Sequence, residues 1–161
     1  MEAPEAALAF LREFGGLDLR LPTACLLGFP IGRWVVELGC HEPDTEGGYG
    51  LLPDDYADLK QLIGPCGLIS QFPEGFTVYV VSEEGVMYDV GIDYPGGVQE
   101  VTPVGWSARE ALENLCNARL VSRDKRVFSK NSRKKLREIR QARRGQGQEK
   151  NRQAQSGPER T

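Results

Sequence analysis

Two groups of charged side chains are the residues of this chain whose type and spacing could do chemistry. Asp54-Asp55 and Glu83-Glu84 are adjacent acids, and paired carboxylates can serve as general acid and base. At the start of a helix or the tip of a turn such pairs are usually solvated, which favours binding over catalysis. The acidic candidates for contact with a partner are Glu42, Asp44, Glu46, Asp54, Asp55, Asp58, Glu83 and Glu84.

The sequence offers no recognised catalytic arrangement. It has no GxSxG, HExxH or GxxxxGK[ST] motif. His41 is the single histidine, and with Cys40 it supplies fewer ligands than a zinc site needs. The four cysteines are widely spaced and are typical of buried thiols. We therefore expect no catalytic residue, no metal and no cofactor, with a small enzyme as the weakest alternative.

Charge is distributed unequally along the chain. Residues 1–118 carry five basic and nineteen acidic side chains, a formal charge of −14, whereas residues 119–161 carry fifteen basic and four acidic ones, a charge of +11. Clusters of Lys and Arg neutralise phosphates, so the second segment is a candidate for weak binding of nucleic acid. Its candidates are Lys125, Arg126, Lys130, Arg133, Lys134, Lys135, Arg137, Arg140, Arg143 and Arg144. The alternative is a solvated extension with no dedicated partner.

The sequence contains no apolar run approaching the roughly 20 residues that span a bilayer. Its first residues, MEAPEAALAF, are acidic and lack the charged leader and apolar core of a signal peptide. We therefore expect a cytoplasmic protein with no membrane contact.

A β-hairpin from Phe76 to Gly91 is the clearest element that the sequence predicts. Two runs with a period of two residues flank Ser82-Glu83-Glu84-Gly85, as in two strands joined by a tight turn. In the first run Phe76, Val78 and Val80 alternate with Thr77, Tyr79 and Val81, and in the second Val86, Tyr88 and Val90 alternate with Met87, Asp89 and Gly91. Gly85 suits a turn position with positive φ because it has no Cβ. This hairpin should form the centre of the sheet, with Glu83 and Glu84 at its exposed tip.

The remaining patterns predict helices and strands that surround the hairpin. Apolar residues at helical spacing indicate helices over 3–14 and 53–63 and a third helix that begins at Ser107, where Glu110 completes a capping box. Strands are expected over 17–21, 24–29, 33–39, 66–70 and 98–104, and an exposed acidic loop over 40–52.

The basic segment 119–161 is predicted to be a tail outside the domain. Residues 133–144 could be transiently helical, but they lack an apolar face wide enough to bury. Residues 145–161 are rich in Gln, Gly, Arg and Ser, and we expect them to be disordered.

The order of these elements resembles the SUKH superfamily, and most closely its third subfamily of immunity proteins. The resemblance covers residues 3–117 and begins with FLREFGGL at 10–17. The matching positions that follow are Gly64, Pro65, Gly67, Val80, Glu84, Gly85, Val86, Tyr88, Gly105, Trp106 and Ser107.

The resemblance implies an α+β fold with a mixed, mostly antiparallel sheet flanked by helices. It also implies a non-catalytic protein that binds and neutralises a cognate toxin of a polymorphic toxin system. Many such toxins are nucleases, whose clefts tend to be basic, and an acidic domain would complement such a cleft. The alternative function is a nucleic-acid-associated adaptor that acts through the basic tail.

Overall fold

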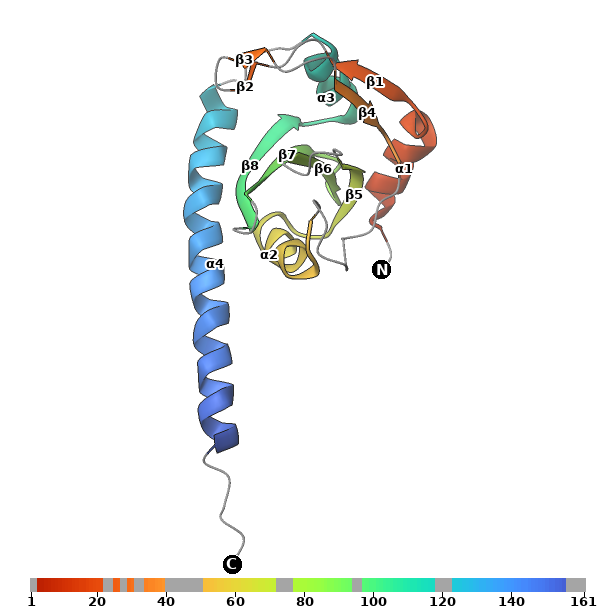
Figure 1. The fold of residues 1–161 in the computed structure, drawn as a ribbon. Coiled ribbons are helices and arrows are strands. Elements are labelled where there is room, and N and C mark those ends of the chain that lie inside the picture. The colour runs from red at the N-terminus through yellow and green to blue at the C-terminus, as the bar shows by residue number, and fades with distance from the viewer. Residues whose placement is uncertain are drawn as a thin grey trace, which may run out of the picture.

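A four-stranded antiparallel sheet lies at the centre of the protein, and helices cover both of its faces (Figure 1). The computed structural model describes residues 3–21, 25–26, 29–30, 34–39, 51–71, 77–93, 97–117 and 123–155. The helices are α1 (Glu5–Phe14), α2 (Pro53–Ile63), α3 (Ala108–Cys116) and α4 (Arg123–Gln155). The central strands are β5 (Cys66–Gln71), β6 (Thr77–Ser82), β7 (Met87–Asp93) and β8 (Gly97–Gly105).

The predicted hairpin is confirmed as β6 and β7, the two inner strands of this sheet. The strands pair antiparallel, with Val78 opposite Val90 and Val80 opposite Tyr88. Gly85 adopts a φ of 80° in the turn, and its N–H donates to the Ser82 carbonyl at 2.9 Å. β5 pairs with β6 and β8 pairs with β7, so β5 and β8 are the edges of the sheet.

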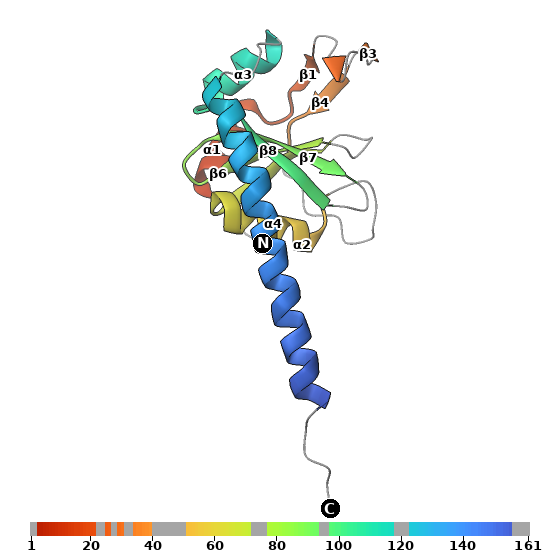
Figure 2. The same cartoon turned by 90° about the vertical axis from the view of Figure 1, so that its left-hand side faces the viewer.

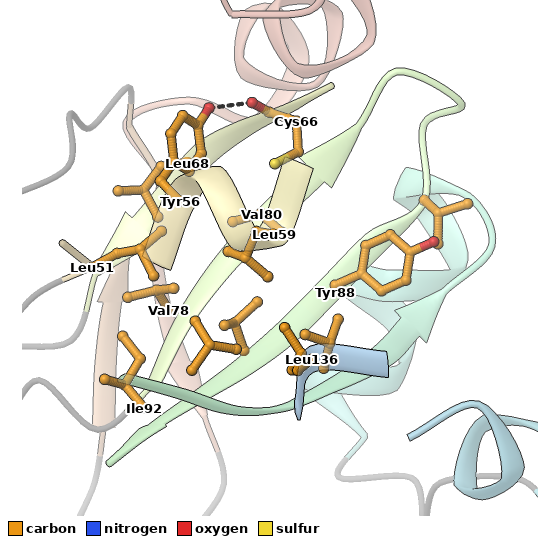
Figure 3. Close-up of a cluster of buried hydrophobic side chains, with 14 residues drawn as sticks. Leu51, Tyr56, Leu59, Cys66, Leu68, Val78, Val80, Tyr88, Ile92 and Leu136 are labelled. Carbon is orange, nitrogen blue, oxygen red and sulfur yellow. Dashed lines mark hydrogen bonds between the residues drawn. The ribbon is translucent and has the colours of Figure 1, made fainter. Parts of the chain in front are cut away.

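Alternation along the strands gives the sheet two apolar faces. On one face, Leu68, Val80 and Val90 join a buried cluster with Leu59 of α2 and Leu136 of α4. Figure 3 shows the side chains of Leu59 and Leu136 pointing into this cluster from the two helices.

The opposite face packs on α1 and α3. Here Ile69, Tyr79 and Met87 are buried together with Phe10 of α1 and Ala111 of α3. The result is a three-layer α+β arrangement in which each face of the sheet supports two helices.

The predicted helices begin where their local signals lie. Pro53 is the first residue of α2, and a proline is tolerated there because the first N–H groups of a helix have no partner within it. Ser107 caps α3 by accepting a hydrogen bond from the Glu110 N–H at 3.3 Å. The Glu110 carboxylate in turn accepts from the Trp106 N–H at 3.0 Å. This return bond completes the predicted capping box one residue earlier than the usual position.

Four short strands precede α2. β1 (Asp18–Leu21) pairs antiparallel with β4 (Trp34–Glu37), which confirms strands within the predicted ranges 17–21 and 33–39. The single strand expected over 24–29 was wrong: the structure has β2 (Cys25–Leu26) paired with β3 (Phe29–Pro30). Two short strands that pair with each other therefore replace the single continuous strand that was predicted. All described strand pairs are antiparallel.

The basic segment is the largest departure from the sequence prediction. Residues 123–155 form one continuous helix, α4, which contains the helix predicted over 133–144 and extends through residues 145–155, which were predicted to be disordered. Residues 156–161, the rest of that predicted disordered segment, lie outside the described residues. Leu136 on this helix is buried and Phe128 is partly buried against the core. A narrow apolar stripe was therefore enough, because charged side chains complete the contact. Both views show α4 beside β8, with its C-terminal part extending past α2 (Figures 1 and 2).

Candidate functional site at the contact of α4 with the acidic body

The first two turns of α2 place three aspartates close to the basic helix. Asp55 and Asp58 are three residues apart and lie on the inner side of α2, where they are 6% and 0% exposed. Asp54 points to solvent. Ionised carboxylates are rarely buried without a partner, so these positions require cationic or hydrogen-bonding neighbours. We use "body" below for the described residues between 3 and 117.

One face of α4 supplies those neighbours. Ser132, Leu136, Arg140 and Arg143 follow one another at intervals of four, four and three residues, which is the spacing of one helical face. Ser132 and Leu136 are buried, and Arg140 and Arg143 are partly buried. This face, which we call the inner face of α4, therefore combines an apolar anchor with two guanidinium groups.

Arg140 is the centre of the ionic contact. Its Nε lies 3.3 Å from Asp58 Oδ2, and its Nη2 lies 3.6 Å from Asp55 Oδ1. Nη2 also donates to the Val98 carbonyl at 2.6 Å. Arg143 lies one turn further along, with Nη1 3.1 Å from Asp58 Oδ1. Two arginines thus surround one fully buried carboxylate.

The second contact of Arg143 is with the start of α2. Its Nη1 donates to the Asp54 backbone carbonyl at 3.0 Å, and it lies 3.7 Å from Asp54 Oδ2. Although Nη1 is close to Asp58 Oδ1, the angle is too poor for a hydrogen bond, and Oδ1 has no hydrogen-bond partner. The contact between Arg143 and Asp58 is therefore an ion pair without a hydrogen bond.

Electrostatics shows that Asp55 is only partly compensated. Burial and, to a lesser degree, the neighbouring Asp58 charge raise the pKa of Asp55, and the opposing effects of the Val98 N–H, Arg140 and Arg143 do not cancel this rise. Val98 N–H donates to Asp55 Oδ1 at 3.4 Å. Removing the Arg140 charge would leave this carboxylate with still less stabilisation.

The inner face of α4 also satisfies the outer edge of β8. The Ser132 hydroxyl donates to the Val101 carbonyl at 3.0 Å and accepts from the Val101 N–H at 3.3 Å. Arg133 forms an ion pair with Glu100 on the same strand. An uncovered edge strand exposes backbone groups that can pair with another chain, so α4 protects this edge.

Gly97 provides the space in which the aspartates and Arg140 meet. Its φ is 74°, and a Cβ there would lie 2.2 Å from Asp55 Oδ1 and 3.0 Å from Arg140 Nη2. A side chain at this position would strain the backbone and displace the ion pair. Next to it, a cavity of about 180 Å³ between β8 and α4 is lined by Val98, Gln99, Arg133, Leu136, Arg137 and Arg140.

The acidic residues predicted to bind a partner are found in three settings. Asp55 and Asp58 are buried under α4, so their prediction as exposed contacts is corrected: they bind arginines of the same chain. Glu83 and Glu84 are exposed at the hairpin tip, as Asp54 is on α2. Glu42, Asp44 and Glu46 lie outside the described residues.

The basic residues predicted to bind nucleic acid also separate. Arg140 and Arg143 are partly buried and paired with acids of α2, whereas Arg133 stays exposed and forms an ion pair with Glu100. Five others are exposed: Lys130, Lys134, Lys135, Arg137 and Arg144. Lys125 and Arg126 lie near the start of α4, and their side chains are outside those described.

Sequence reasoning missed Ser132, Leu136 and Asp89. The first two stand with Arg140 at intervals of four residues, and this spacing was the available signal. Asp89 lies on β7 opposite Tyr79 and Thr102, deeply enclosed although part of its surface stays accessible. Burial, with the nearby Glu100 charge, raises the pKa of Asp89 to about 7. The position of Asp89 within an alternating strand pattern does not indicate that its carboxyl group is buried or that its pKa is raised.

Within the described parts of the chain, no group of three or more His, Cys, Asp and Glu side chains is arranged to hold a metal ion. Among the same residues, no helix has both the length and the apolar character needed to cross a membrane. Comparison of the chain with protein-family models, curated proteins and solved structures finds no significant match.

Proposed function

We propose that this protein binds a basic partner protein without catalysis, as an immunity protein that neutralises a cognate toxin. The observation that carries the proposal is that the body holds a basic helix through Asp55 and Asp58. A surface that accommodates two arginines in one chain has the chemistry to accommodate arginines of another. The resemblance of residues 3–117 to the SUKH superfamily also supports a role as an immunity protein.

Exposed acids give the body a second region for contact. Glu83 and Glu84 are exposed at the tip of a hairpin whose strands are largely buried, and the Glu83 N–H donates to the Pro65 carbonyl at 2.8 Å. The docked basic helix offsets most of the acidic charge of residues 1–118, and the full chain carries a formal charge of −3. The acids that stay exposed, Glu83 and Glu84 among them, are therefore the ones that would attract a basic cleft at low ionic strength. A nuclease toxin, whose cleft must attract phosphates, is the kind of partner that fits this charge.

Growth rescue tests the proposal. Expression of the full chain together with the toxin domain encoded beside its gene should restore growth of sensitive cells. Replacing Glu83 and Glu84 with lysine should weaken rescue, whereas the same charge change at Glu13 and Glu113, exposed on α1 and α3, should not. Failure of the unaltered chain to protect against that toxin would contradict the proposal.

The outward face of α4 favours a second candidate, binding to nucleic acid. Lys130, Lys134, Arg137 and Arg144 are exposed and follow one another at intervals of four, three and seven residues, so they lie on one side of the helix. This row is offset around the helix from the inner face, and Arg137 within it also lines the cavity between β8 and α4. A regular row of cations on a continuous helix can follow a phosphate backbone.

Salt dependence distinguishes this candidate from the first. Four phosphate contacts predict that the logarithm of the association constant for duplex DNA falls against the logarithm of salt concentration with a slope of about −3 to −4. Replacing the four residues with glutamine should abolish binding of a labelled 20-base-pair duplex in an anisotropy titration. Equal binding by that variant would refute the candidate. Deleting α4 is a poorer test because it would also uncover β8.

A further inference from the structure

The inner face of α4 has a defined recognition pattern. A small hydroxyl residue, Ser132, is followed by leucine four residues later and by arginines eight and eleven residues later. Ser132 contacts the β8 backbone, Leu136 contacts the apolar core, and both arginines contact Asp58. The pattern therefore describes the kind of helix that the body recognises.

The surface that receives this helix is formed by the body alone. Val98 and Val101 present backbone groups along the β8 edge, and the apolar cluster supplies the floor under Leu136. Asp55 and Asp58 lie at the other end of the surface. In the sequence, Asp58 and Arg140 are 82 residues apart. We call this surface the α4 groove. None of its contacts depends on α4 belonging to the same chain.

We propose that the α4 groove is a docking site for a basic helix of a partner protein, and that α4 occupies it as an internal competitor. The occupant is a helix that carries a small polar residue, a leucine and two arginines at positions i, i+4, i+8 and i+11. The ion pairs, the β8 hydrogen bonds and the apolar contact that α4 itself makes with the groove carry this identification. The inference rests on the proposed function only in taking the partner to be a protein with a basic helix.

Covalent attachment determines how strong the competition is. A tethered segment acts at an effective concentration on the order of millimolar, so a free helix with the same contacts must reach that concentration to displace α4 from half the molecules. The apparent affinity for a free helix is reduced by the fraction of molecules in which the groove is open. Weakening α4 in its own chain should therefore tighten binding of a separate helix.

A peptide of residues 123–145 is the probe for this competition. The full chain with Arg140→Gln and Arg143→Gln should bind the labelled peptide at least tenfold more tightly than the unaltered chain, by fluorescence anisotropy. The matched control, Lys130→Gln with Arg144→Gln, removes the same charge from exposed positions of α4 and should bind like the unaltered chain. Adding Asp58→Asn to the first variant should remove most of the gain, because the peptide arginines lose their buried partner.

A second measurement covers the case in which the Arg140 and Arg143 variant folds poorly. Saturating peptide should then raise its thermal midpoint, because a ligand that binds only the folded state stabilises it. A peptide with both arginines replaced by glutamine should not. The same affinity for all variants, or no effect of the peptide on either affinity or midpoint, overturns the inference. Peptide binding without growth rescue would refute the proposed function and keep the groove, whereas rescue without peptide binding would do the reverse.

Discussion

Replacing Arg140 with glutamine is the sharpest test of how α4 is held. The substitution removes the 3.3 Å contact with Asp58, the 3.6 Å contact with Asp55 and the donor to the Val98 carbonyl. Asp58 is fully buried, and leaving a buried charge without its partner costs about 3–5 kcal/mol. Arg143 stays close to Asp58, and the Arg140 side chain is one-fifth exposed, so both reduce this cost. We therefore expect a loss of about 2–4 kcal/mol in the free energy of unfolding.

Urea denaturation at pH 7, followed by circular dichroism, measures this loss. Thermal unfolding should show a midpoint lower by roughly 5–15 °C for a chain of this size. The double variant with Asp58→Asn isolates the pair, and a coupling energy of about 1–3 kcal/mol is expected because the two residues are in contact. Arg144→Gln, an exposed position on the same helix, should change stability by less than about 0.5 kcal/mol. An Arg140 variant as stable as the Arg144 control would refute the ionic account of α4 docking.

Three further predictions concern the interior. Leu136→Ala should lower the free energy of unfolding by about 2–4 kcal/mol in urea denaturation, because it opens a cavity in the core between α4 and the sheet; a loss as small as that of a surface alanine would mean that α4 is not packed. Ser132→Ala should cost about 1–3 kcal/mol and speed hydrogen exchange at the Val101 amide, which loses its acceptor; unchanged exchange would place another partner at that edge. The raised pKa of Asp89, about 7, favours its neutral form in the folded chain, so the associated stability is fully present below about pH 4 and is lost as pH rises through 7. Asp89→Asn should therefore stabilise the protein by on the order of 2–4 kcal/mol at pH 8 and hardly at all at pH 4, and equal effects at both values in denaturant titrations would exclude this role.

Local sequence patterns were sufficient to predict several strands and helices of the body. The alternation from Phe76 to Gly91 and the glycine in its turn predicted β6 and β7, because a strand pattern with a matched turn is satisfied by neighbouring residues. The capping box at Ser107 and Glu110 likewise located the start of α3. These signals operate over a few residues and need no knowledge of distant segments.

The predicted site was harder to place because its members attract one another. The sequence predicts that the acidic and basic residues form two surfaces for two outside partners, one for a toxin and one for nucleic acid. In the structure, members of both sets face each other within a single chain. Composition reveals that opposite charges are present, but not which of them lie within the few ångströms at which a buried pair forms.

The segregation of charge and the helical spacing of Ser132, Leu136 and Arg140 are properties of residue order alone. Burial of this face of α4 depends on segments that are distant in the chain. An apolar stripe as narrow as Leu136 and Phe128 does not predict docking, since the same helix also depends on polar contacts whose partners are remote in the chain. Those partners, the β8 backbone edge and the aspartates of α2, become neighbours only when the sheet has formed. Hydrogen bonds and buried ion pairs act over such short distances that the fold must bring their atoms together first.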